Sequence, residues 1–340
     1  MRGLTVSLDF WNTIAYDATR TRKQAQLAAI ANDLFANRLA EDALRASLDA
    51  LIAGPNAFTG AGLLRAVADR HELPTSDEAC MRIATRVSEI ATEFPPKFVE
   101  GLSEVLERLS SRSRLVLSSN TYLTSGDSIR EIMSVQGILG HFVELNFSDE
   151  VRAVKQDPSF FKDLLLRNPG DLVHVGDSEH LDMAPAKLAG ATPILARTLP
   201  RPYVQRKTTA SAITYDIAGI PLVQDYLSAP EALAPKATGL GICGSIVVGR
   251  AHLVRGRAPG SVPVGRVLMF GTTVPEYEEY FQSAAAVVTE TGGYGSHAAH
   301  FAPYVGVACV IGAANIRSRV SDGDLVVVDP QRGVILGRSA

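Results

Sequence analysis

The sequence predicts an α/β protein of two domains: a parallel sheet with helices on both faces, then a smaller, strand-rich domain. Three observations support this fold class. Short apolar strands alternate with helical segments over residues 102–196, which is typical of a parallel sheet covered on both faces. Residues 228–238 hold two prolines and little periodicity, as in a semi-rigid linker. Beyond them glycine and valine become frequent and the strands shorten.

The first part begins with a strand at residues 4–8 and continues with a long helical segment. Residues 18–94 are rich in Ala, Leu, Arg and Glu, and apolar residues recur there at helical spacing, as at Leu27, Ile30 and Leu34. Pro95 and Pro96 end this segment. We expect a helical cap of about residues 15–96, inserted after the first strand and lying over the strand ends.

The alternating elements then follow in order along the chain. Helices are predicted at 102–109, 129–135, 160–166 and 180–188, and strands at 114–118, 142–147, 172–175 and 193–196. In the second domain, strands are predicted at 246–248, 267–270, 286–289, 307–311 and 325–328, with a turn at 329–334. We therefore place the domains at 1–227 and 239–340, joined by a linker at 228–238.

Composition excludes several classes of protein. With 340 residues, 46% hydrophobic and 20% charged, the chain is globular, and its net charge of −3 gives no argument for a nucleic-acid or membrane partner. No apolar stretch reaches membrane-spanning length, and the N-terminal one is too short for a signal peptide. Three cysteines without metal-ligand spacing fit a reducing compartment, so we expect a cytoplasmic protein.

Five polar side chains fall where predicted strands of the first domain end, or in the loops beyond them. Asp9 follows the first strand, Ser119 the second and Asp177 a later one, while Lys155 and Asp182 lie in loops nearby. The carboxyl ends of parallel strands form the binding edge of such a sheet. A carboxylate nucleophile beside a phosphate needs cations, so we expect Asp9 as nucleophile and Mg²⁺ held by Asp9, Asp177 and Asp182. Ser119 would bond a phosphoryl oxygen and Lys155 would bridge nucleophile and phosphate.

In these residues, residues 1–227 resemble the haloacid dehalogenase (HAD) superfamily of hydrolases and phosphotransferases. The resemblance implies a Rossmann-like three-layer core with an inserted helical cap. Phosphatases of that superfamily carry a second Asp two places after the nucleophile, as general acid/base, where this chain has Trp11. An indole cannot shuttle a proton near neutral pH, and loss of a general acid/base costs about 10²–10⁴ in rate. Attack by Asp9 on a donor with a good leaving group is expected to survive that loss.

A second motif lies near the C-terminus, where Gly292 and Gly293 precede Ser296 and His297. A strand leads into this glycine turn, and an Ala-rich helix is predicted to start at the histidine. Backbone N–H groups at a helix N-terminus can hold phosphoryl oxygens while an imidazole nitrogen acts as nucleophile. The motif therefore predicts that His297 is phosphorylated; we expect His300 to be partly buried packing.

This stretch, about residues 239–338, resembles the phosphohistidine swivelling domain of phosphoenolpyruvate-utilising enzymes. The resemblance implies a β/β/α domain in which His297 is the phosphoryl carrier. Three positions depart from the family pattern: Tyr294 and Pro303 replace basic residues, and Gly295 replaces a threonine. Loss of two cations near a phosphate weakens its electrostatic binding.

Together these motifs predict an Mg²⁺-dependent protein that transfers or hydrolyses the phosphoryl group of a small metabolite through Asp9, with His297 as relay. Since the sequence shows no Gly-x-x-x-x-Gly-Lys loop, a separate nucleotide-binding or phosphoenolpyruvate-binding kinase subunit would load His297, or the Asp9 domain would exchange with it. Two alternatives stay open. The chain could be a decayed two-module scaffold or regulator, or Asp9 could attack carbon in a hydrolytic dehalogenase, which Trp11 favours and the acidic pair opposes.

Overall fold

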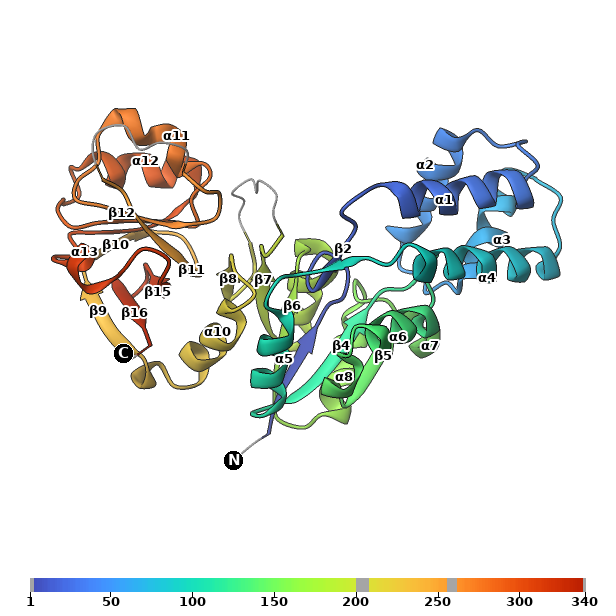
Figure 1. The fold of residues 1–340 in the computed structure, drawn as a ribbon, viewed down its shortest axis with the longest axis horizontal. Coiled ribbons are helices and arrows are strands. Elements are labelled where there is room, and N and C mark those ends of the chain that lie inside the picture. The colour runs from blue at the N-terminus through green and yellow to red at the C-terminus, as the bar shows by residue number, and fades with distance from the viewer. Residues whose placement is uncertain (1–2, 200–207, 256–261, 339–340) are drawn as a thin grey trace. The chain divides into compact units, whose positions relative to one another are not determined.

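The computed structural model describes residues 3–199, 208–255 and 262–338, and their contacts divide the chain into two compact units (Figure 1). The first unit holds the residues up to 99 together with 106–176 and 180–191; the second holds 100–105, 177–179 and the residues from 192 onward. Among the described residues, no helix combines the length and the apolar character that crossing a bilayer requires.

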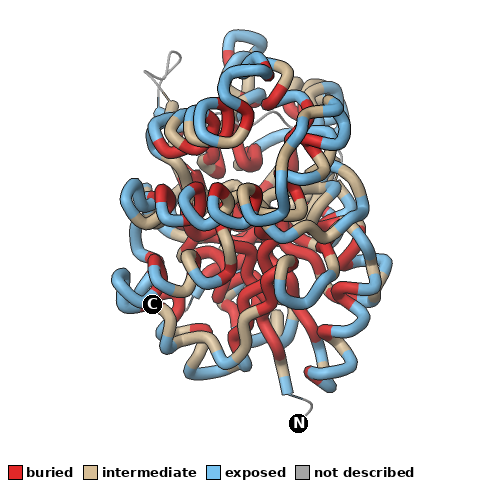
Figure 2. Tube along the Cα trace, turned by 90° about the vertical axis from the view of Figure 1, so that its right-hand side faces the viewer, coloured by how far each residue is buried: buried red, intermediate tan, exposed pale blue. Residues whose placement is uncertain are grey.

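A parallel sheet forms the core of the first unit. Its strands lie in the spatial order β6 (Asp171–Gly176), β1 (Leu4–Leu8), β4 (Arg114–Ser119) and β5 (Glu144–Phe147). The central strand β1 is buried over its last four residues, because it has a neighbour on each side (Figure 2). The register pairs Leu8 with Leu117 and with Val175, so the carboxyl ends of three strands meet at one edge.

The connections between these strands are mainly helical. They are α5 (Leu102–Ser110), α6 (Gly126–Val135), η2 (Leu139–His141), α7 (Ser148–Val151), α8 (Pro158–Arg167), η3 (Glu179–Met183) and α9 (Ala184–Ala189). Helices α8 and α9 bury an apolar cluster against the sheet, which includes Phe161, Leu164 and Ala186 on the helices and Val116 and Leu172 on the strands.

The predicted helical segment is a bundle inserted after β1. It comprises α1 (Thr21–Ala29), the π-helical turn η1 (Ile30–Leu34), α2 (Glu41–Ile52), α3 (Gly60–Arg70) and α4 (Asp77–Glu93). Strands β2 (Ala15–Tyr16) and β3 (Lys97–Phe98) pair at its two ends. The bundle has a core of its own, with Leu44, Leu63 and Val67 fully buried, so it is a separate cap.

The second unit is built on a longer strand order. Strand β8 (Ala212–Thr214) lies between β7 (Thr192–Ala196) and the first half of β11 (Ile246–Leu253), all parallel. The second half of β11 starts a parallel series with β12 (Val267–Phe270), β13 (Ala286–Thr289) and β14 (Ala308–Ile311).

Antiparallel strands complete this second sheet. Strand β10 (Leu240–Cys243) pairs with β14, and β15 (Leu325–Asp329) pairs with β11 and with β16 (Val334–Gly337). Strand β9 (Ala234–Thr238) pairs with β16. More than a third of the segment that the sequence predicts as linker is therefore ordered in a sheet, preceded by α10 (Gly219–Ser228) and η4 (Pro230–Ala232).

Four short helical segments accompany the parallel series: η5 (Pro275–Tyr277), α11 (Glu278–Phe281), α12 (His297–Val305) and α13 (Ile316–Arg319). Helices α11 and α12 share one apolar cluster with the strands, in which Phe281, Ala298 and Ala302 pack with Leu268 and Val287. The structure thus has the predicted fold class, a mixed α/β core with a cap followed by a smaller domain with strands and helices.

Candidate functional sites

Asp9 stands at the end of the central strand of the first unit. Its backbone N–H donates to Val175 O at 2.9 Å, which extends the strand pairing by one residue, and only 4% of its surface is exposed. The chain then turns sharply, with Asn12 in the left-handed region at φ 61°. That turn lets Thr13 Oγ1 donate to Asp9 Oδ2 at 3.3 Å, so the carboxylate is both buried and oriented.

Lys155 is the cation of this site. Its Nζ lies 2.5 Å from Oδ1 of Asp9 and 2.5 Å from Oδ1 of Asp182, and the side chain is almost fully buried. Burial by itself would lower the pKa of Lys155, but the charges of Asp182 and Asp9 outweigh burial and raise the pKa. The lysine is therefore held charged, at the position where a bound phosphate would need a positive charge.

The loop that carries Lys155 is fixed by an amide side chain. Asn120 Oδ1 accepts from the Lys155 backbone N–H at 2.9 Å, and Asn120 Nδ2 donates to Gln156 Oε1 at 2.8 Å. Because Asn120 directly follows strand β4, the sheet edge itself sets the position of the lysine loop.

Asp182 is connected to a second polar side chain that the sequence analysis missed. His174 Nε2 lies 3.0 Å from Asp182 Oδ1, and its Nδ1 lies 3.0 Å from Ser7 Oγ. Burial lowers the pKa of His174 although Asp182 opposes this. Burial would raise the pKa of Asp182, but Lys155 and His174 outweigh burial and lower it. A polar residue at 174 within an otherwise apolar strand, paired with Ser7 in register, was the available signal.

Asp177 completes an acidic group at the end of β6. One carboxylate oxygen from each of Asp9, Asp177 and Asp182 lies within 4.8 Å of the others. Gly176 permits this approach, because a Cβ atom there would lie 2.3 Å from Asp182 Cγ. Three hard oxygen donors this close fit Mg²⁺ by the chemistry of the donor set.

Ser119 is the last residue of β4 and is fully buried. Its hydroxyl donates to Asn120 O at 3.4 Å, and the structure shows it at the same sheet edge as Asp9 through the β1–β4 pairing. Of the five polar residues predicted for this edge, the structure therefore joins Asp9, Lys155 and Asp182 by ion pairs and places a carboxylate oxygen of Asp177 within 4.8 Å of those of Asp9 and Asp182.

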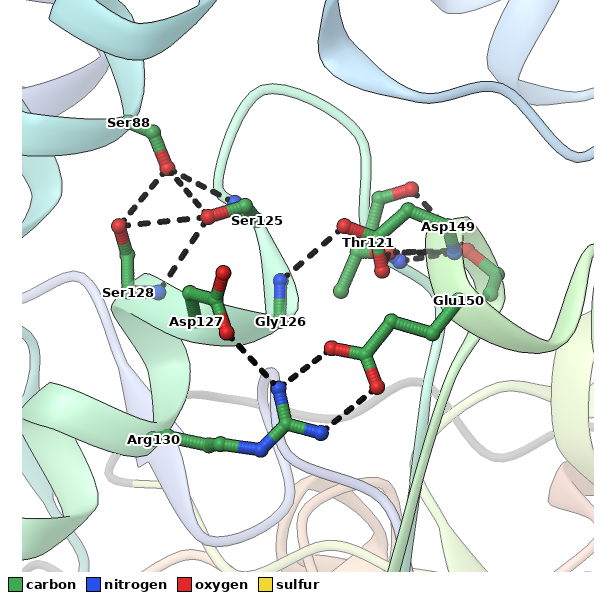
Figure 3. A network of polar contacts seen from close by, with 10 residues as sticks. Ser88, Thr121, Ser125, Gly126, Asp127, Ser128, Arg130, Asp149 and Glu150 are labelled. Atoms are coloured by element: carbon green, nitrogen blue, oxygen red, sulfur yellow. Dashed lines mark hydrogen bonds and ion pairs between the residues drawn. The ribbon is translucent and has the colours of Figure 1, made fainter.

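A polar network supports the loop beyond Ser119 and Asn120 (Figure 3). Ser148 Oγ accepts from Thr121 N at 2.8 Å, while Asp149 accepts from the Thr121 hydroxyl at 2.6 Å and from Gly126 N at 3.1 Å. Ser125 caps α6, and Ser88 of the cap helix α4 lies 2.9 Å from its hydroxyl oxygen. The network ties the cap to the loop that positions the lysine.

Trp11 lines a pocket of about 390 Å³ between the cap helices and the sheet edge of the first unit. The guanidinium of Arg22 lies over the Trp11 ring, 4.1 Å from its centroid, and also binds Asp17 and Thr124. Asn120, Gln26 and Leu48 are among the other residues that line the pocket. The position that carries an acid/base in the resembled phosphatases is thus part of an aromatic and cationic wall.

His297 begins helix α12 in the second unit, as predicted. The preceding loop uses Gly292 at φ 129°, a conformation that favours glycine, and a Cβ there would lie 3.2 Å from Ser296. Ser296 is the N-cap residue, but its hydroxyl makes no capping bond to the helix. His297 is 19% exposed, with Nε2 3.0 Å from Oε1 of Glu278. The expectation for His300 is wrong: this residue is exposed, because it faces away from the cluster that buries Ala298 and Ala302.

Two charged residues near this loop were not predicted. Glu278 lies on α11, nineteen positions before the histidine, where no sequence pattern indicated it. Arg317 N donates to Glu290 Oε1 at 3.1 Å, and a Cβ atom on Gly271 would lie 2.7 Å from its guanidinium. Arg317 therefore brings a cation to the loops that follow β12 and β13, a region where Tyr294 replaces an expected basic residue.

Comparison with known proteins agrees with these two units. Residues 262–333 match the family described as "PEP-utilising enzyme, mobile domain". A stretch of 110 residues is 40% identical to an uncharacterised protein of Mycobacterium tuberculosis, covering 32% of this chain and 13% of that protein. Another of 71 residues is 39% identical to phosphoenolpyruvate synthase of Aeropyrum pernix, covering 21% of this chain and 9% of that enzyme. The chain thus spans a small part of these relatives.

The N-terminal fold also has a solved counterpart. The crystal structure of a 2-haloacid dehalogenase from Pseudomonas syringae pv. tomato covers 67% of this chain and 100% of that protein, with a TM-score of 0.50 and 19% sequence identity. The N-terminal part therefore has the fold of this dehalogenase, and residues 262–333 match the mobile domain of PEP-utilising enzymes; the comparisons thus confirm the fold that the first resemblance predicts and the second resemblance over these residues.

Proposed function

We propose that the first unit transfers or hydrolyses the phosphoryl group of a small metabolite through Asp9, and that His297 carries a phosphoryl group on the second unit. One observation supports the first part above all: Asp9, Lys155 and Asp182 form a buried cluster of two carboxylates around one ammonium group, with Asp177 close by, so the cluster keeps an excess of negative charge that suits a metal cation. Burying several charged groups together costs free energy of folding, and such clusters are common in active sites.

In the proposed reaction, a carboxylate oxygen of Asp9 forms a bond to phosphorus while the bond from phosphorus to the leaving oxygen breaks. The leaving oxygen keeps the electron pair and takes a proton from water. Lys155 neutralises the carboxylate and the phosphate together, and Thr13 orients the attacking side chain. Water, or another acceptor, then displaces Asp9 from the acyl phosphate.

Mg²⁺ would be held by Asp9, Asp177 and Asp182 and would supply electrostatic stabilisation of the charge on the phosphoryl oxygens. Because Trp11 offers no carboxylate for proton transfer, the chain's own residues favour donors whose leaving group needs little protonation. This makes transfer from a reactive phosphate easier than hydrolysis of a stable ester.

The cap pocket suggests the substrate's size and character. A volume of about 390 Å³ suits a small metabolite, and the wall combines the Trp11 ring and Leu48 with the polar side chains of Gln26 and Asn120. We therefore propose a small phosphorylated compound that has both an apolar and a polar part. The free cysteines Cys80, Cys243 and Cys309 fit a cytoplasmic setting for this activity.

The proposal is tested with a generic aryl phosphate in the presence of Mg²⁺. We expect turnover that EDTA abolishes and that Asp9→Asn reduces to background, whereas Asp163→Asn, an exposed carboxylate of the same unit, leaves it unchanged. Absence of Mg²⁺-dependent turnover in the wild type, together with failure to form any adduct, would instead support the scaffold alternative.

Phosphoryl adducts distinguish the two proposed acceptors. The protein is incubated with acetyl phosphate, with phosphoenolpyruvate, or with ATP and a candidate kinase subunit, and its intact mass is measured. We expect a gain of one phosphoryl group. A hydroxylamine-sensitive adduct should disappear in Asp9→Asn, and an acid-labile one in His297→Ala.

A dehalogenase is the second candidate, because Trp11 and Arg22 together form an aromatic and cationic wall at the pocket. In that reaction Asp9 would attack carbon and release halide, with no need for a metal. Halide release from a 2-halo acid that persists in EDTA would support this candidate, and phosphatase activity that requires Mg²⁺ would exclude it.

A further inference from the structure

The imidazole of His297 is held on three sides in the second unit. Its ring stacks on Phe301 at 5.7 Å between centroids and 12° between planes, and it meets Phe281 edge-on at 6.1 Å. Glu278 Oε1 lies 3.0 Å from Nε2. These contacts fix both the plane of the ring and the direction in which each nitrogen faces.

The two ring nitrogens have different environments. The Nδ1 atom is buried, and no hydrogen-bond partner for it is found among the residues that the structure describes. An incoming phosphoryl donor therefore has access only to Nε2, the atom that Glu278 already contacts. Since a carboxylate only accepts hydrogen bonds, Nε2 carries the proton of this contact, and it cannot attack phosphorus until that proton has left it.

Glu278 can leave this position without unfolding its surroundings. Its side chain is 46% exposed, whereas its neighbour Tyr277 is 5% exposed and Phe281 fully buried. The backbone of the short helix α11 is thus anchored by two aromatic side chains of the core, while the carboxylate lies at the surface and is free to rotate.

We propose that Glu278 is the positioning residue of His297: it holds Nε2 on the accessible side of the ring and keeps it protonated, and both the carboxylate and this proton must leave before Nε2 can accept the phosphoryl group. This proposal rests on the carrier role proposed above. The carboxylate and the phosphoryl group are both anions that require the same atom, so they compete for it. Glu278 thus selects the nitrogen and slows its modification at the same time.

Phosphoramidate tests this without any enzymatic donor. In the reaction, Nε2 forms a bond to phosphorus while the P–N bond of phosphoramidate breaks, and the leaving nitrogen takes the proton that the ring loses and departs as ammonia. Phosphorus NMR distinguishes the two phosphohistidine isomers, and the signal that is lost in His297→Asn belongs to this residue.

The wild type should give the Nε2 isomer alone. Glu278→Gln keeps an acceptor oxygen but removes the charge, so it should react about two- to fivefold faster at the same nitrogen, the size of one partly exposed charge contact. Glu278→Ala should also react faster and yield a second isomer at Nδ1, because the ring can then turn. Glu276→Gln, an exposed neighbour, is the matched control and should behave as wild type.

A spectroscopic measurement separates positioning from a merely structural role. Long-range ¹H–¹⁵N spectra should show the Nε2–H tautomer of His297 in the wild type and a mixture in Glu278→Ala. A wild-type rate in Glu278→Gln, or a single isomer in Glu278→Ala, would overturn the proposal. If the chemical adduct follows these expectations but no biological donor loads His297, the carrier function fails while the role of Glu278 stands.

Discussion

At the scale of single residues, the charge balance at the end of β1 depends on Lys155. Its ammonium group contacts two buried carboxylates, Asp9 and Asp182, and both are less than one-tenth exposed. Removing one partner of a buried ion pair destabilises a protein more than replacing both partners by apolar residues, because the remaining charge stays buried without compensation.

Lys155→Met should therefore lower the free energy of unfolding by about 3–5 kcal/mol. Added Mg²⁺ should restore part of this loss, because a cation bound by the carboxylates replaces the missing charge. Urea unfolding followed by the fluorescence of Trp11, the single tryptophan, reports on this unit. Lys162→Met, on the exposed face of α8, should change stability by less than about 0.5 kcal/mol; an equal effect of both variants would contradict the argument.

His174 should make the first unit sensitive to mild acid. Burial lowers the pKa of His174, so the folded protein keeps the ring neutral while the unfolded chain takes up a proton as the pH falls below about 6.5. Unfolding then binds a proton, and stability falls with pH. The lowered pKa of Asp182 adds a further loss below about pH 4.

The measurement compares the urea midpoint at neutral pH with that at mildly acidic pH. In His174→Gln the loss of stability across this interval should be smaller than in the wild type, whatever the stability of the variant at neutral pH. The exposed His300→Gln should keep the wild-type dependence. Identical pH dependence in all three proteins would show that His174 does not titrate on unfolding.

Sequence reasoning reached the carboxylates and the lysine but not their partners. Asp9, Lys155 and Asp182 could be predicted because polar residues at parallel strand ends must converge. His174 lies inside a strand, where the spacing of a single histidine indicates no function. Its position beside Ser7 follows from the register of the two strands. Glu278 could not be predicted, because only the packing of α11 against α12 brings it to the histidine.

At the scale of elements, the loop after β4 connects the sheet edge to the cap. Ser125 caps helix α6, whose N-terminus begins with Gly126, and the Ser88 hydroxyl accepts from Ser125 N at 2.9 Å (Figure 3). Gly126 is required there, since a Cβ atom would lie 2.6 Å from the Phe147 ring. The same few residues thus start a helix and anchor the cap.

Ser125→Ala should destabilise the first unit by about 1 kcal/mol through loss of the N-cap. The same change at Ser134, an exposed position on the same helix, should have little effect. Urea unfolding of both variants, monitored by Trp11 fluorescence, checks the difference. Equal stability of the two variants would mean that the capping bond contributes nothing measurable.

The strands of the second unit show where pattern-based prediction stops. Strand β9 was predicted as linker because of Pro235, which normally argues against a strand. The residue is tolerated because it lies at a register shift opposite Leu336, in a strand paired only with β16 among the described elements. The shifted register allows Pro235 to lie in a strand, and the sequence does not reveal this shift.

At the scale of the whole molecule, the two acceptors proposed above, Asp9 and His297, lead us to predict exchange of a phosphoryl group between them. A covalent connection raises the effective concentration of one site at the other, so even a weak encounter becomes frequent. If the first unit consumes the phosphoryl group of His297, loss of the phosphohistidine adduct should depend on Asp9.

This dependence is measured with protein loaded by phosphoramidate and then freed of reagent. In the presence of Mg²⁺, the His297 adduct should decay faster in the wild type than in Asp9→Asn, and EDTA should remove the difference. Asp163→Asn serves as control and should decay as the wild type does. Equal decay in all samples would mean that the two acceptors work independently.

The pairing of β8 with β11 affects where the chain can be divided for the expression of fragments. A fragment starting near residue 239 would lack β8 and would leave one side of the first half of β11 without its partner strand. Such a bare edge invites association between copies, so that fragment should precipitate or form oligomers. A fragment that starts at residue 192 keeps β7 and β8 beside β11, which moves the unpaired edge from β11 to β7.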